Sequence, residues 1–252
     1  TWQCYMDYHE ALHYDIAFAG QCAYVPHLRA AGSRHVHWLP MACNPVLHKP
    51  TAAKESHDIS FVGGLTEPVH WRRAPLLTAL QQHFDVQVLA RVYGNAMNDA
   101  YATGRIAFNH AAVQDVNMRI FETLAMGRAL ITNRDSTANG LIDLFEDEKH
   151  LLIYDGERDI IRKASRLLSD DTLRAHLQRE GREEVLAHHT YSHRVQTILD
   201  TVRALCPGFE SCSAGPLARG DNLVEYLPRG CTSLLDYGAG LGISKLALAR
   251  RG

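Results

Sequence analysis

Polar and charged residues stand at the start of an apolar segment, 117–126, whose periodicity predicts a helix. Glu122 would lie in its second turn, open to solvent, where a carboxylate can accept hydrogen bonds from two vicinal hydroxyls of a ribose. Asn117, Met118 and Arg119 would lie at its N-terminus, where unpaired N–H groups, the helix dipole and the arginine favour an anion. One helix start could therefore hold the ribose and the diphosphate of a single ligand. The alternative is structural, with Asn117 as an N-cap and Arg119 and Glu122 as a surface ion pair.

A glycine-rich turn after a predicted strand, 59–62, is a second candidate anion site. Gly63 and Gly64 would let a ligand approach the backbone closely. Arg72 and Arg73, at the start of the next predicted helix, would supply bidentate donors to a phosphate. Taken alone, this motif favours the simpler interpretation, a tight turn beside two solvated arginines.

Strands and helices alternate along most of the chain, which predicts an α/β fold with a parallel sheet covered on both faces. The predicted strands of the main unit lie at 59–62, 86–90, 106–109, 129–132 and 151–154. Its predicted helices lie at 74–84 and 117–126, with three more after 154. A strand–helix–strand unit is predicted before them, at 14–20, 24–31 and 35–39, followed by a linker or crossover at 44–58.

A third glycine-rich turn follows a predicted strand near the C-terminus and precedes a predicted helix. It has the G-x-G-x-G spacing of a cofactor turn, formed by Asp236, Gly238, Gly240 and Gly242. This turn resembles motif I of class I S-adenosylmethionine-dependent methyltransferases. In that family the acidic residue that holds the ribose follows the next strand, which would begin after Gly252. We therefore expect S-adenosylmethionine to bind at these residues only in a longer chain.

Composition argues against several classes of protein. The chain has 26 Lys and Arg against 28 Asp and Glu, and a formal net charge of −2 does not suit a dedicated nucleic-acid binder. No apolar run approaches the ~18 residues of a membrane span. The six cysteines never adopt a C-x-x-C spacing, so we interpret them as reduced thiols of a cytoplasmic protein. No Asp-x-Asp pair is present to hold a divalent metal.

The segment 117–132 (NMRIFETLAMGRALIT) resembles the pattern N-x-R-x-F-E-x-x-A-x-G-x-x-x-x-T of the spore-maturation-type (CgeB-like) glycosyltransferases of the two-Rossmann GT-B class. The resemblance extends to FVGGL and RRAPLLTAL before it, and to HWLPMACNPVLHKP at the crossover. It covers residues 1 to about 205 and is strongest at 58–135.

The resemblance implies a function and a set of site residues. In that family the C-terminal Rossmann domain binds a nucleotide-diphosphate sugar and the N-terminal domain holds most of the acceptor, without a required metal or cofactor. Glu122 would bind the ribose, and Arg119, Asn117 and Gly63 would lie by the diphosphate. Arg119 and Glu122 are the residues we expect to act in glycosyl transfer. Gln114 stands where many related retaining enzymes have a glutamate, which leaves the stereochemical class open.

Four units are predicted from these patterns: the tail of an acceptor domain, a nucleotide-sugar-binding domain, a linker rich in Gly, Pro and Ser, and the start of a methyltransferase-like domain, at 1–50, 51–205, 206–220 and 221–252. The predicted function is transfer of a sugar from a nucleotide-diphosphate sugar to a glycan, a lipid-linked sugar or a protein. Two alternatives stay open: a methyltransferase activity in a longer parent protein, and a non-catalytic nucleotide-binding segment.

Overall fold

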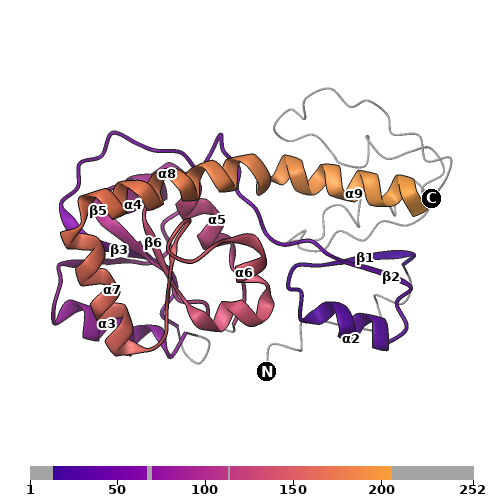
Figure 1. Cartoon of the computed structure of the whole chain (residues 1–252), viewed down its shortest axis with the longest axis horizontal. Coiled ribbons are helices and arrows are strands. Elements are labelled where there is room, and N and C mark those ends of the chain that lie inside the picture. Colours follow the sequence, from indigo (N-terminus) through magenta and orange to yellow (C-terminus); the bar gives the residue numbers. More distant parts are fainter. Residues whose placement is uncertain (1–13, 67–69, 113, 206–252) are drawn as a thin grey trace.

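The computed structural model describes residues 14–66, 70–112 and 114–205, and parallel sheets form its framework (Figure 1). The smaller sheet pairs β1 (Ile16–Ala19) with β2 (His35–Trp38), and α2 (Tyr24–Ala30) connects them. This strand–helix–strand unit agrees with the sequence prediction. Its small core contains Leu28 and Val36.

The main sheet has five parallel strands in the order β4-β3-β5-β6-β7. These strands are β3 (His57–Val62), β4 (Val86–Leu89), β5 (Gly104–Phe108), β6 (Leu130–Asn133) and β7 (Leu152–Tyr154). All five lie within three residues of their predicted positions. The predicted α/β class with a parallel sheet is therefore confirmed.

Apolar side chains on both faces of this sheet pack against helices. Along β3, Ile59 and Phe61 belong to one core and Val62 to the other, as the alternation of a strand requires. The first face is covered by α3 (Arg73–Gln81) and α7 (Glu157–Ser169), and the second by α4 (Gly94–Ala102) and α5 (Met118–Ala125).

Two long helices run end to end across both sheets, α8 (Asp171–His188) and α9 (Tyr191–Leu205) (Figure 1). Their junction is tied to the crossover, because Cys43 N–H donates to His189 O and Tyr191 N–H donates to Cys43 O, both at 3.0 Å. The crossover is thus fixed where it passes the main sheet. Within the described part of the chain, no helix is both long and apolar enough to cross a bilayer.

Three short elements were not predicted from the sequence: α4, the 3-10 helix η2 (Arg134–Asn139) and α6 (Leu141–Leu144). The sequence of α4, GNAMNDAYA, opens on glycine and contains two asparagines, all poor helix formers. Its Met97, Ala100 and Tyr101 are nevertheless buried in the core shared with α5. Tertiary packing therefore overrides the local preference here.

Gly181 lies where α8 packs tightly against the rest of the domain. A Cβ at this position would lie 2.4 Å from the backbone oxygen of His150 and 2.8 Å from Leu124 Cδ2. Gly181→Ala should therefore lower the free energy of unfolding by about 1–3 kcal/mol through overpacking. Chemical denaturation measures this, with Glu183→Ala at an exposed position of the same helix as the control. Equal stability of the two variants would contradict the tight contact.

The order of the strands creates a crevice at one end of the main sheet. From β3 the chain moves outward to β4 and then returns to β5 on the other side of β3. The loops that leave β3 and β5 therefore diverge at the carboxyl ends of two neighbouring strands. In open α/β sheets ligands bind at this switch point.

Candidate functional site

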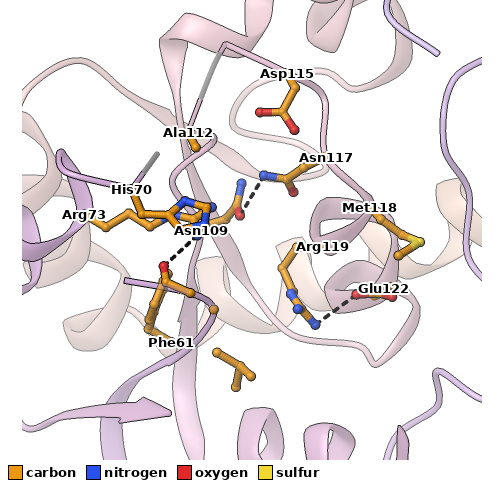
Figure 2. Close-up of a pocket in the computed structure, with 13 residues that line it drawn as sticks. Phe61, His70, Arg73, Asn109, Ala112, Asp115, Asn117, Met118, Arg119 and Glu122 are labelled. Carbon is orange, nitrogen blue, oxygen red and sulfur yellow. Dashed lines mark hydrogen bonds and ion pairs between the residues drawn. The ribbon is translucent and has the colours of Figure 1, made fainter. Parts of the chain in front are cut away.

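A cavity of about 340 Å³ lies at the carboxyl ends of β3 and β5, against the N-terminus of α5 (Figure 2). Of the eight nucleotide-sugar-binding residues expected from the sequence, seven line it: Gly63, Gly64, Arg73, Asn117, Met118, Arg119 and Glu122. In Figure 2, His70 and Arg73 face Asn117, Arg119 and Glu122 from the opposite side. The fold therefore brings the two sequence motifs to one cavity.

Arg72 and Arg73, grouped by the sequence analysis, lie in different environments. Arg72 does not line the cavity; it pairs at the surface with Asp135, with an N–O distance of 3.2 Å. Arg73 is buried, and it donates hydrogen bonds to His110 O and Gly64 O, both at 2.9 Å. Burial lowers the pKa of Arg73. Arg73 thus holds together the loops after β3 and β5, so the expectation of two solvated arginines is wrong for Arg73. Phosphate binding stays a prediction, and of the two arginines only Arg73 lines the cavity.

The start of α5 is anchored to the end of β5 through side-chain amides. Asn117 Nδ2 donates to Asn109 Oδ1 at 3.2 Å, and Asn109 Nδ2 donates to Thr132 Oγ1 at 2.9 Å. Asn117 occupies the N-cap position with extended backbone, but its side chain makes no capping hydrogen bond. The side chain thus leaves the N–H groups of the first turn to other partners. Such groups are available to an anion.

The carboxylate of Glu122 is held by partners on both oxygens. Arg119 Nη1 lies 3.0 Å from Oε2, and His48 Nε2 lies 3.4 Å from Oε1. The Glu122 side chain is only 8% exposed, so the expected solvent-accessible glutamate is in fact buried at the wall of the cavity. The alternative predicted an ion pair between Arg119 and Glu122 at the surface. The pair forms, but Glu122 is buried, so the predicted surface position is wrong.

Three residues of the cavity wall that carry polar side chains were missed by the sequence analysis: His70, Asn109 and Asp115. Asn109 could have been found, because it is the last residue of a predicted strand and a polar one. His70 has no local signal; its ring lies over the glycine turn, 3.0 Å from where a Cβ of Gly64 would be. Burial and the charge of Arg73 lower the pKa of His70, which keeps its ring neutral at pH 7.

The loop before α5 is fixed by the N-terminal unit. Val116 N–H donates to Gln21 Oε1 at 2.8 Å, and Gln21 Nε2 donates to Val116 O at 3.3 Å. Gln114 lies outside the cavity lining in left-handed backbone (φ 63°), and its carbonyl accepts a hydrogen bond from Asn139. Asp115, its neighbour, is the side chain of this loop that reaches the cavity with a carboxylate.

The described residues contain no group of three or more His, Cys, Asp or Glu that could hold a metal ion. Charged groups of both signs surround the cavity, with Arg73 and Arg119 as cations and Asp115 and Glu122 as acids. This arrangement suits a ligand that carries an anion beside hydroxyl groups. The third glycine-rich turn, with Asp236, Gly238, Gly240 and Gly242, lies outside the described residues.

Comparison with known families identifies one matching model. Residues 45–200 match the family described as glycosyl transferase-like. No curated protein sequence matches the chain significantly.

Solved structures of glycosyltransferases resemble this one. Sucrose-phosphate synthase from Thermosynechococcus elongatus is 15% identical with a TM-score of 0.60, over 81% of this chain and 63% of that one. Anabaena HepE, solved in complex with UDP and glucose, is 12% identical with a TM-score of 0.62, over 78% of this chain and 66% of that one. A glycosyltransferase from Rickettsia africae is 12% identical with a TM-score of 0.57, over 79% of this chain and 65% of that one. These similarities show a shared fold, and the expected GT-B fold is confirmed. This chain spans about two thirds of the length of each of these proteins.

Proposed function

The chain belongs to the glycosyl transferase-like family, and from this we propose that it binds a nucleotide-diphosphate sugar and transfers the sugar to an acceptor. The observation that carries the proposal is the cavity at the switch point of the sheet, where α5 presents its N-terminus beside Arg119 and Glu122. Two of the structurally similar proteins, HepE and TarM, were solved with UDP, which supports a uridine nucleotide as the first ligand to test.

Within this proposal each part of the donor has a complementary part of the cavity. The diphosphate would lie at the N-terminus of α5, close to Asn117 and Arg119, with Gly63 and Gly64 leaving room for it. The ribose would lie at Glu122. As the bond between the sugar and the diphosphate breaks, negative charge grows on the leaving oxygen, and Arg119 and the helix N-terminus would stabilise it.

The finer assignments are also proposals. We assign the chain to the spore-maturation-type (CgeB-like) group on the 117–132 segment, residues 1–50 to the tail of an acceptor domain, and 221–252 to the start of a methyltransferase-like domain after the 206–220 linker. The acceptor would be a glycan, a lipid-linked sugar or a protein. The resemblance implies that no metal or other cofactor is needed for the proposed glycosyl transfer, and Arg119 is the cation that would lie by the diphosphate.

A panel of ligands tests the proposed function. UDP, ADP and GDP, UDP-glucose and S-adenosylmethionine are each titrated into the protein by calorimetry, with the shift in melting temperature as a second readout. At least one nucleoside diphosphate should bind saturably and raise the melting temperature, because a ligand that binds only the folded state stabilises it. Binding of S-adenosylmethionine alone would instead favour the methyltransferase alternative, and no binding at all would refute the proposal.

A further inference from the structure

His48 contacts Glu122 from a segment of the chain far from the helix that carries the glutamate. It lies on the crossover between β2 and β3, its side chain is 11% exposed, and it does not line the cavity. Its Nε2 approaches Glu122 Oε1 at 3.4 Å. Arg119 contacts the other oxygen of the same carboxylate. Each carboxylate oxygen of Glu122 therefore has a partner, one on α5 and one on the crossover.

The position of the His48 proton follows from its second contact. The backbone N–H of Asn44 donates to His48 Nδ1 at 3.1 Å, so Nδ1 carries a lone pair and Nε2 carries the proton. Burial, the largest influence, lowers the pKa of His48, and Arg119 lowers it too, against the opposite effect of Glu122. The ring is thus neutral at pH 7, and its protonated Nε2 is the nitrogen that lies near the carboxylate, 3.4 Å from Oε1.

The turn that carries His48 is itself well fixed. Val46 N–H donates to Asn44 Oδ1 at 3.0 Å, and His48 N–H donates to Asn44 O at 2.8 Å. From the second face of the main sheet, Asn98 Nδ2 donates to Leu47 O at 2.6 Å. A ring held at both its backbone and its Nδ1 can impose an orientation on its partner.

The remaining hydrogen-bonding capacity of Glu122 matches a diol. An ionised carboxylate offers about four lone-pair sites, two on each oxygen. Arg119 takes one site on Oε2 through a hydrogen bond and the His48 ring lies beside Oε1, which leaves at least one acceptor site on each oxygen. Because Glu122 lines the cavity, these two sites are available to the two vicinal hydroxyls of a ribose.

We propose that His48 is a positioning residue, which fixes the Glu122 carboxylate so that one acceptor site on each oxygen meets a ribose hydroxyl. This rests on the proposed function. In this role His48 does not touch the ligand. Replacing His48 should therefore weaken only the hydrogen bonds between Glu122 and the ribose hydroxyls.

The test compares ligands that differ only in those hydroxyls. Dissociation constants of UDP and ADP, each against its 2′,3′-dideoxy analogue, are measured for the wild type, His48→Phe and His48→Gln. His48→Phe keeps a ring without a donor and should reduce the preference for the ribose form about tenfold, with dideoxy binding unchanged. His48→Gln supplies an N–H and should recover most of the preference. His83→Gln, at an exposed histidine outside the cavity lining, is the matched control.

A double-variant cycle separates positioning from a general structural effect. In a Glu122→Gln background, His48→Phe should cause little further loss of ribose preference, because the two residues act as a unit. If His48→Phe weakens ribose and dideoxy ligands equally, or weakens neither, the positioning role is overturned. If the wild type prefers the ribose form and Glu122→Gln abolishes that preference while His48→Phe does not, the proposed function stands without His48. If no nucleoside diphosphate of the panel, GDP included, binds the wild type, both proposals fall.

Discussion

Glu122→Ala should raise the dissociation constant of a nucleoside diphosphate about 30- to 1,000-fold. The carboxylate would accept two charge-assisted hydrogen bonds from the ribose, each contributing about 1.5–3 kcal/mol. Water replacing the side chain and non-additivity reduce the sum to about 2–4 kcal/mol. Calorimetric titration of the wild type and the variant at one temperature measures the difference.

The burial of Glu122 requires a control for folding. Removing its side chain leaves His48 and Arg119 without their shared partner in a poorly solvated position, so Glu122→Ala should also lower the melting temperature. Glu122→Gln keeps the shape and one acceptor oxygen, and should lose affinity with a smaller loss of stability. Unchanged dissociation constants in both folded variants would remove Glu122 from the binding site, and the assignment of the ribose with it.

The parts of the fold that the sequence predicted well are those with strong local patterns. The strands of the main sheet contain short, mainly apolar stretches, such as residues 59–62 and 152–154, and these residues are buried. The apolar face of α5 and Gly127 after it, in left-handed backbone at φ 70°, made that helix predictable to within one residue. Asn117 is the N-cap of α5, and Arg119 and Glu122 lie in the helix. The prediction of this helix therefore also predicted that these three residues lie close together.

The contacts that set the character of the site are long-range, and no local pattern could show them. Arg72 and Arg73 are neighbours in sequence, yet one points to Asp135 at the surface and the other into the domain. Gln21 reaches Val116 across 95 residues, and His48 reaches Glu122 from the crossover. Local periodicity describes which face of an element is buried. It does not describe which distant side chain meets that face.

Burial also changes the chemistry expected of the site. A solvent-exposed ion pair between Arg119 and Glu122 would contribute a few tenths of a kcal/mol and would not orient either partner. In the structure the Arg119 side chain is 23% exposed, and its Nη1 contacts both Glu122 and the sulfur of Met97, so this end of the guanidinium is held by two partners. A cation fixed in advance can stabilise developing charge without reorganising during the reaction. We therefore expect Arg119 to be a cation that acts on a diphosphate.

Arg119→Ala should raise the dissociation constants of nucleoside diphosphates about 10- to 100-fold, because a charge-assisted contact of about 1.5–3 kcal/mol is lost. The bare nucleoside should lose less affinity, because it would feel only the effect of Arg119 on the orientation of Glu122, whereas the diphosphate would also lose a cation. Dissociation constants are measured for UDP and uridine, and for ADP and adenosine. The ratio of the constant of the nucleoside to that of its diphosphate separates the contribution of the phosphates from that of the ribose. Binding of the diphosphate should also become less sensitive to salt.

Arg72→Ala and Arg119→Lys complete this comparison. Arg72 carries the same charge outside the cavity, paired with Asp135, so Arg72→Ala should leave the ratio unchanged. Arg119→Lys keeps the charge but loses the planar fork that reaches Glu122 and a phosphate together, so it should recover only part of the affinity. Equal losses for diphosphate and nucleoside in Arg119→Ala would mean that the arginine acts only by orienting Glu122. A loss in Arg72→Ala as large as that in Arg119→Ala would mean that the diphosphate responds to distant charge, and that the N-terminus of α5 is not its binding site.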